Sequence, residues 1–143
     1  MTSPPIEWRP NLAVFVRRCL WVGGGTLVVF GGFGIVTGFW QILFAAPVLL
    51  AAYTFLFDDH LKWLDIRHDR WELTASTLVH HGFEGEAHVP LAEITGATTR
   101  FGWAVIVTLT SGLRIEIPYV RNPSDIAAQI IAARDRITGT LRD

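Results

Sequence analysis

The pattern of apolar and polar residues divides the chain at two sharp boundaries. From Cys19 to Phe57 there is no Asp, Glu, Lys, Arg or His, whereas charged residues are spread along the rest of the sequence. One membrane-spanning helix needs about 20 apolar residues, so this run has about twice the length of one span. Thr37-Gly38 interrupts the run near its middle. The pattern therefore predicts a membrane α-hairpin over residues 19–57, with helices at 19–36 and 39–57 joined by a tight turn.

Basic residues flank both ends of this apolar run. Arg17 and Arg18 precede it, and Lys62, Arg67 and Arg70 follow it, whereas the expected turn carries no charge. Lys and Arg concentrate on the cytoplasmic side of membrane helices. We therefore expect a multi-pass protein with both termini in the cytoplasm, in which residues 1–18 form a short N-terminal segment.

Glycine is unusually dense in the first half of the apolar run, in the stretch "GGGTLVVFGGFG" at 23–34. A phosphate-binding loop would need a Lys after its last Gly, or a third Gly in the dinucleotide spacing, and neither is present. Small residues in membrane helices allow close backbone approach. The predicted packing positions are Gly24, Gly31, Gly34, Gly38, Ala45 and Ala52. They would hold the hairpin together or recruit another membrane protein, and both interpretations stay open.

The remainder of the chain changes its period twice. Residues 58–69 read as a juxtamembrane connector, and alternation of apolar and polar residues follows to about residue 119, with turn signals at Ala75-Ser76, 83–85 and Ser111-Gly112. Asn122 and Pro123 then provide a helix start. The pattern predicts an α+β domain over 70–143, in which about six or seven antiparallel strands are capped by one C-terminal helix.

Four segments of this domain resemble the bacterial pleckstrin-homology-like domains. They are "WELTASTLVHHG", "VPLAEIT", "SGLRIEIP" and "RNPSDIAAQI". The resemblance implies a β-roll or split barrel, and a role in scaffolding, complex assembly or oligomerisation. Similar domains follow two-helix hairpins in many small bacterial proteins, some of which assist assembly of photosynthetic or respiratory complexes. The resemblance therefore implies that this protein is an accessory or assembly factor in the bacterial inner (cytoplasmic) membrane. It would bind a membrane-protein partner or further copies of itself.

Charge and cysteine content exclude several classes of function. The formal net charge is −1 at pH 7, which is not the basic footprint of a nucleic-acid-binding protein. The first hairpin turn, Ala75-Ser76, is short and uncharged, which disfavours phosphoinositide binding because such headgroups need several cationic donors. The single cysteine, Cys19, cannot form an intrachain disulfide.

Three histidines in "VHHGFEGEAHV" form the one cluster with metal-binding character, at His80, His81 and His88. A turn centred on Glu84-Gly85 would place His81 opposite His88, with Cβ atoms about 5 Å apart. Glu84 or Glu86 could join two imidazoles there. The alternative interpretation is a set of surface polar residues, since the spacing fixes no third ligand. We expect no metal or cofactor, and keep a metal-dependent sensor or enzyme as one alternative.

The other candidates are weaker in catalytic character. Ser76, Ser111 and Ser124 occupy turn or cap positions, where serine is expected for conformational reasons, so we expect no enzyme.

Phe101 and Trp103 flank Gly102 in a loop between two strands, where exposed aromatics could contact a partner or the membrane. Binding of lipid headgroups by the domain is the remaining alternative function.

Overall fold

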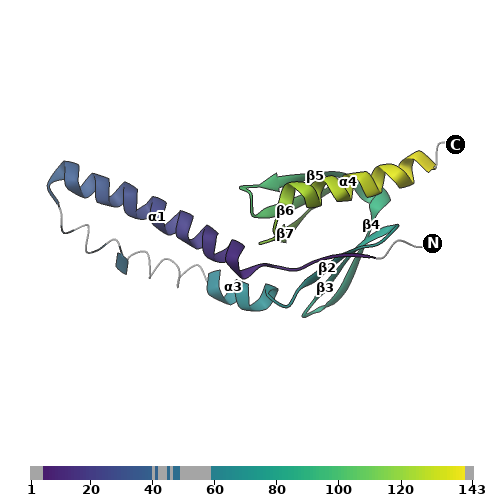
Figure 1. The fold of residues 1–143 in the computed structure, drawn as a ribbon, viewed down its shortest axis with the longest axis horizontal. Helices are drawn as coiled ribbons and strands as arrows, with labels where there is room; N and C mark the ends of the chain where they lie inside the picture. The colour runs from purple at the N-terminus through teal and green to yellow at the C-terminus, as the bar shows by residue number, and fades with distance from the viewer. Residues whose placement is uncertain (1–4, 40, 42–44, 46, 49–58, 141–143) are drawn as a thin grey trace. The chain divides into compact units, whose positions relative to one another are not determined.

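The computed structural model describes residues 5–39, 41, 45, 47–48 and 59–140 (Figure 1). The chain divides into two compact units, one made of Met1–Val14 with Asp65–Asp143 and the other of Phe15–Leu64. We call these the β-rich unit and the helical unit. Residues 1–14 were expected within an N-terminal segment and instead belong to the β-rich unit. The helical unit is therefore an insertion into the sequence of the β-rich unit.

The first sheet of the β-rich unit has four antiparallel strands in the order β1-β2-β3-β4. They are β1 (Ile6–Trp8), β2 (Arg70–Leu73), β3 (Thr77–Gly82) and β4 (Gly85–Pro90). The predicted turn at Ala75-Ser76 is confirmed, because Thr74 N donates to Thr77 O at 2.9 Å across it. β1 was not predicted. It pairs Trp8 with Trp71, so its partner lies across the whole insertion.

The second sheet has three antiparallel strands in the order β5-β6-β7. They are β5 (Ile94–Arg100), β6 (Ala104–Leu109) and β7 (Arg114–Pro118), and the short helix η1 (Leu91–Glu93) leads into them from β4. The turn predicted at Ser111-Gly112 joins β6 to β7, as the pairing of Thr108 with Arg114 shows. This element pair follows directly from the alternating sequence pattern.

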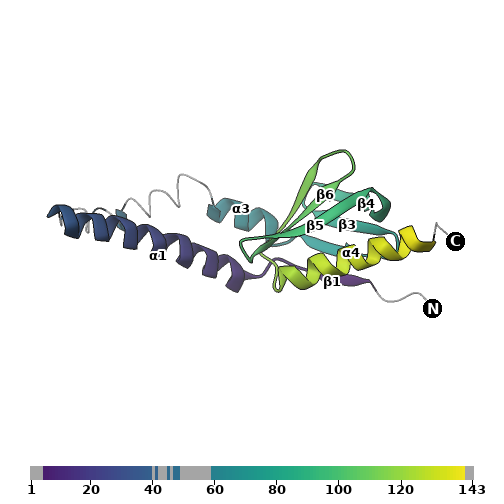
Figure 2. The ribbon, with the colours of Figure 1, turned by 90° about the horizontal axis from the view of Figure 1, so that it is seen from above.

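The helix α4 (Pro123–Thr140) packs on η1, β5 and β6, and Figure 2 shows it running beside β5. It begins at the predicted Pro123 and includes Gly139. Its buried side is Ile126, Ala127, Ile130 and Ala133. The core unites both sheets and this helix, and includes Trp71, Leu73, Leu78, Leu91, Ile94, Val105, Val107, Ile117 and Ile130.

The helix α1 (Leu12–Thr37) begins seven positions before the predicted start at Cys19. Asn11 caps it, because its Oδ1 accepts a hydrogen bond from Ala13 N at 3.0 Å. Charge therefore marks the limit of the apolar run but not the limit of the helix. The helix α3 (Asp59–Ile66) contacts the first turn of α1. Its Trp63 stacks on Phe15 of α1, with ring centroids 4.9 Å apart.

The predicted membrane α-hairpin is wrong for the chain that the structure describes. Its described residues contain three α-helices, of which α1 alone is long and apolar enough to cross a membrane. The predicted break is in place, since α1 ends at Thr37 and Gly38 has φ +73°. The second span expected at 39–57 falls largely outside the described residues. The structure thus contains one possible membrane-spanning helix and a sheet-rich unit.

The predicted location in the membrane depended on the α-hairpin and changes as well. A multi-pass protein of the bacterial inner membrane, with both termini cytoplasmic, would need at least two spanning helices among these elements. The described residues supply one, with a mean hydropathy of 1.8 over its most apolar window and 17% of that window buried. The multi-pass prediction is therefore not supported.

The predicted small-residue positions differ in their surroundings. Gly31 and Gly34 are buried, whereas a Cβ built on Gly24 or Gly38 would meet no atom within 4 Å. Gly23, which was not predicted, is buried on α1 instead of Gly24. Ala45 is exposed in the described chain, and Ala52 lies outside the described residues.

Candidate functional site

The hairpin of β3 and β4 carries all three candidate histidines, but in a register different from the predicted one. The turn is centred on Phe83-Glu84, one residue earlier than expected, so Gly82 pairs with Gly85. Because a shift of the turn by one residue moves the strand pairing by two, His81 faces Glu86 and His88 faces Val79. The predicted pairing of His81 with His88 is wrong.

His81 instead belongs to a row of alternating charges on the outer face of the four-stranded sheet. Its Nδ1 lies 2.8 Å from Glu86 Oε1 and its Nε2 lies 3.3 Å from Glu72 Oε2. Both nitrogens can donate at once only when the imidazole is protonated. The row includes all four strands, through Arg9, Glu7, Arg70, Glu72, His81, Glu86 and His88.

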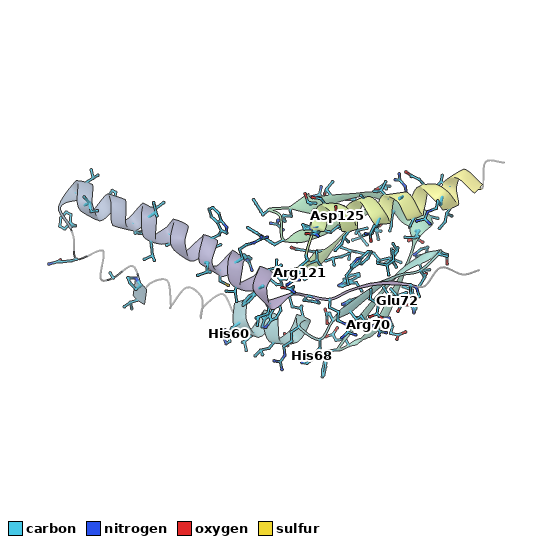
Figure 3. All side chains as sticks on the ribbon, in the orientation of Figure 1. His60, His68, Arg70, Glu72, Arg121 and Asp125 are labelled. Atoms are coloured by element: carbon cyan, nitrogen blue, oxygen red, sulfur yellow. The ribbon has the colours of Figure 1, made fainter. Side chains whose placement is uncertain are left out.

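This charged row is a surface feature. Arg70 lies 3.4 Å from Glu7 and 3.8 Å from Glu72, and Figure 3 shows Arg70 and Glu72 together on the sheet. Exposed ion pairs each contribute at most about 1 kcal/mol. No group of three or more His, Cys, Asp or Glu side chains within the described part of the chain is arranged to hold a metal ion.

His80 points to the opposite face of the sheet and is held on three sides. Its ring stacks on Trp71 with centroids 4.2 Å apart, and its Nε2 donates to Asp69 Oδ2 at 2.9 Å. A Cβ on Gly82 would lie 2.9 Å from His80 Cε1, so any other residue at this position would have to displace the ring. Trp71 contributes its ring alone, because its buried Nε1 has no hydrogen-bond partner within the described chain.

This arrangement gives a testable prediction at Gly82. Replacing Gly82 with alanine is expected to destabilise the β-rich unit by about 1–2 kcal/mol, because the His80 ring cannot retreat past Trp71. Urea unfolding followed by circular dichroism measures the change. Gly96→Ala is the matched control, since a Cβ there meets nothing within 4 Å. Equal losses in the two variants would contradict the tight packing of His80.

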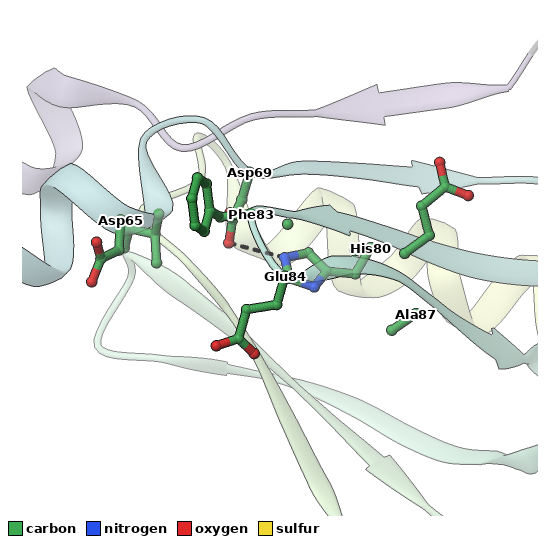
Figure 4. A pocket seen from close by; sticks show the side chains of 10 residues that line it. Asp65, Asp69, His80, Phe83, Glu84 and Ala87 are labelled. Atoms are coloured by element: carbon green, nitrogen blue, oxygen red, sulfur yellow. Dashed lines mark hydrogen bonds and ion pairs between the residues drawn. The ribbon is translucent and has the colours of Figure 1, made fainter.

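An open pocket of about 490 Å³ lies beside His80 at the tip of the β3–β4 hairpin. Figure 4 shows the Asp69–His80 bond within it. The lining residues are Asp65, Ile66, Asp69, His80, Gly82, Phe83, Glu84, Gly85, Glu86 and Ala87. Of the carboxylates among them, that of Asp69 contacts His80, whereas that of Glu86 ion-pairs with His81 on the opposite face of the sheet. No Ser, Thr or Cys is among these lining residues, so the pocket offers no hydroxyl or thiol nucleophile of its own.

Two features give this pocket a particular chemical character. Asp65 and Glu84 have no ion-pair partner among the described residues, so their charge is uncompensated. Phe83 at the rim is 98% exposed. A cation suits both features, because carboxylates attract it and an aromatic face stabilises it.

Sequence reasoning missed most of this pocket. Asp65 and Asp69 were assigned to a connector, and Phe83 was read only as part of a turn. The signal that could have found them is the acidic and aromatic content of "FEGE" at 83–86, which begins three residues after His80.

The aromatic candidates Phe101 and Trp103 lie in the turn between β5 and β6. Their rings stack with centroids 5.3 Å apart, and Phe101 is 73% exposed. They are at a different turn from the pocket.

Comparison with known protein families, curated proteins and solved structures gives no match to this chain.

Proposed function

We propose that this protein is a membrane-anchored interaction module. In this proposal α1 holds the chain in a lipid bilayer, and the β-rich unit binds another protein through the pocket at the β3–β4 tip. The partner presents a basic side chain to Asp65, Glu84 and the Asp69–His80 pair. The module acts as an accessory subunit or assembly factor of a larger membrane complex.

The anchoring half of the proposal is supported by the dimensions of α1. Its uncharged portion runs from Cys19 to Thr37, which at about 1.5 Å per residue approaches the ~30 Å thickness of the hydrocarbon core. Arg17 and Arg18 at one limit of this portion suit the headgroup region, as does Trp21, which is 72% exposed.

The open, charged pocket is the observation that carries the binding half. Sites for small molecules usually enclose their ligand. This pocket is open, and its lining includes carboxylates and the almost fully exposed Phe83. Those properties fit a Lys or Arg side chain that a partner protein inserts. The sequence resemblance to bacterial pleckstrin-homology-like domains, for which scaffolding is the implied role, motivates the same proposal.

Site-directed photo-crosslinking in native membranes tests the proposal. Benzoylphenylalanine at position 83 is expected to form one major cross-linked product with a protein, whose contact peptide contains Lys or Arg by mass spectrometry. The same probe at Leu113 is the control, because Leu113 is 67% exposed but lies in the β6–β7 turn. Equal products at both positions, or none at 83, would overturn the proposal.

Charge removal supplies a second criterion. The double variant Asp65→Asn with Glu84→Gln is expected to reduce the product at position 83 about tenfold, since a hydrogen bond to a charged group contributes about 1.5 kcal/mol or more. Glu116→Gln, on the second sheet, is expected to leave the yield unchanged.

A further inference from the structure

The turn between β5 and β6 presents a compact exposed cluster of two aromatic rings and a cation. Phe101 stacks on Trp103, and the guanidinium carbon of Arg100 lies 5.7 Å from the centre of the Phe101 ring. Arg100 Nη1 also lies 3.7 Å from Glu116 Oε2, and both side chains are about half exposed. The exposed Phe101 ring, beside Arg100 and the half-buried Trp103, makes this turn a candidate interaction surface.

One residue of this turn, Phe101, has a strained backbone conformation that burial of its side chain does not offset. Phe101 has φ +50° and the following Gly102 has φ +73°. The left-handed region suits Gly or Asn and is costly for a bulky side chain. Phe101 gains little burial in return, since it is 73% exposed. A residue that is both strained and exposed points to a role in binding.

Backbone hydrogen bonds locate this turn at the point where the β-rich unit leads into α1. Val120 N donates to Trp103 O at 3.1 Å, and Asn11 N donates to Tyr119 O at 2.7 Å. Asn11 immediately precedes Leu12, the first residue of α1. Figures 1 and 2 both show the β5–β6 turn at the same end of the β-rich unit as the start of α4. These two backbone hydrogen bonds connect the turn, through Tyr119 and Val120, to the residue that precedes α1.

We infer that the Arg100–Trp103 turn is a second membrane contact, which seats Phe101 and Trp103 in the interfacial layer of the bilayer that holds α1. This inference rests on the anchoring half of the proposed function. Trp is favoured at the depth of the lipid headgroups because its ring is amphipathic. Arg100 lies where its guanidinium can bind lipid phosphate.

Quenching of tryptophan fluorescence by brominated lipids tests this contact on the full chain. The protein is reconstituted in phosphatidylcholine–phosphatidylglycerol vesicles whose acyl chains carry bromine close to the headgroups. The chain has six Trp, so the contribution of Trp103 is the difference between the parent and Trp103→Phe. We expect Trp103 to be quenched. Unquenched Trp103 fluorescence would overturn the inference.

Trp21 on α1 separates failure of this inference from failure of the proposed function. The difference between the parent and Trp21→Phe reports whether α1 is in the bilayer. If Trp21 is quenched and Trp103 is not, α1 is anchored and the second contact is wrong. If neither is quenched, anchoring itself fails. Cross-linking of position 101 to a protein, instead of lipid, would also overturn the lipid contact.

Phe101→Asn is the complementary variant, since Asn tolerates the left-handed backbone. It is expected to raise the Tm of the β-rich unit by about 4 °C, because strain is relieved. It is also expected to reduce the quenching of Trp103, because the stacked ring is lost. A lower Tm, or unchanged quenching of Trp103, would contradict the assignment of Phe101 to membrane contact.

Discussion

Replacing Ile130 with alanine is expected to lower the free energy of unfolding of the β-rich unit by about 3–4 kcal/mol. The Ile130 side chain is 0% exposed and lies in the cluster that joins α4 to both sheets. Its removal leaves a cavity that the surrounding strands cannot fill, because packed interiors relax only partly. Urea unfolding of the full chain in detergent micelles, followed by far-ultraviolet circular dichroism, measures the loss.

Ile131→Ala is the matched control for this variant. It deletes the same atoms from the adjacent residue of α4, but Ile131 is only partly buried. A loss of about 1 kcal/mol is expected there, in proportion to the apolar area that is removed from water. Losses of equal size would mean that α4 docks on the sheets through a different face.

The difference between Ile130 and Ile131 also shows which parts of the fold can be predicted from the sequence. The period of α4 places Ile126 and Ile130 on one face, and the alternation in β6 and β7 sets their pairing. These elements bury one continuous face, so the hydrophobic period carries the information. β6 and β7 are also neighbours in sequence, whereas the apolar face of α4 packs on η1, β5 and β6.

β1 could not be predicted in this way. Its three residues, Ile6–Trp8, are too few to show a period, and its partner β2 begins only at Arg70. The loop between them contains the whole helical unit. Contacts across such a separation depend on tertiary packing, which local pattern does not encode. Residues 1–18 were assigned to a separate N-terminal segment because of this long separation in sequence between β1 and β2.

The candidate site was predicted only in part, for a related reason. The sequence singled out His80, His81 and His88, but the turn position decides which residues meet. A shift of one residue in the β3–β4 turn paired His81 with Glu86, whereas the contacts of His80 with Asp69 and Trp71 come from the side of β2. Turn signals in "GFEGE" allow both centres, because glycine occurs on either side of Phe83-Glu84. Apolar periodicity does not report the choice.

The membrane prediction failed at a different level. Hydropathy measures the length of an apolar run, and it says nothing about where a helix starts. α1 extends back through Arg17 and Arg18 to the cap at Asn11, so one helix uses more of the sequence than the uncharged run suggested. A capping side chain, and not the absence of charge, sets that boundary.

Introducing an arginine at Val28 is expected to release the protein from membranes if α1 crosses the bilayer as proposed. Val28 lies midway between Cys19 and Thr37 and is 75% exposed, so the new side chain meets lipid and not protein. An arginine at the centre of a spanning helix costs about 2.5–3.5 kcal/mol on insertion scales. This corresponds to a shift of about a hundredfold between the inserted and the released forms. Carbonate extraction of membranes, followed by quantification of the pellet and supernatant, measures that shift.

Val36→Arg is the control that gives this experiment its meaning. Val36 is 87% exposed, as available to lipid as Val28, but it lies one residue before the end of α1. An arginine there can extend its guanidinium to the headgroup region at much lower cost. We therefore expect Val36→Arg to remain in the carbonate-resistant pellet while Val28→Arg does not. If both variants stay in the pellet, the middle of α1 is not at the centre of a bilayer. If both are released, the loss reflects added charge at any position, and spanning by α1 is not its cause.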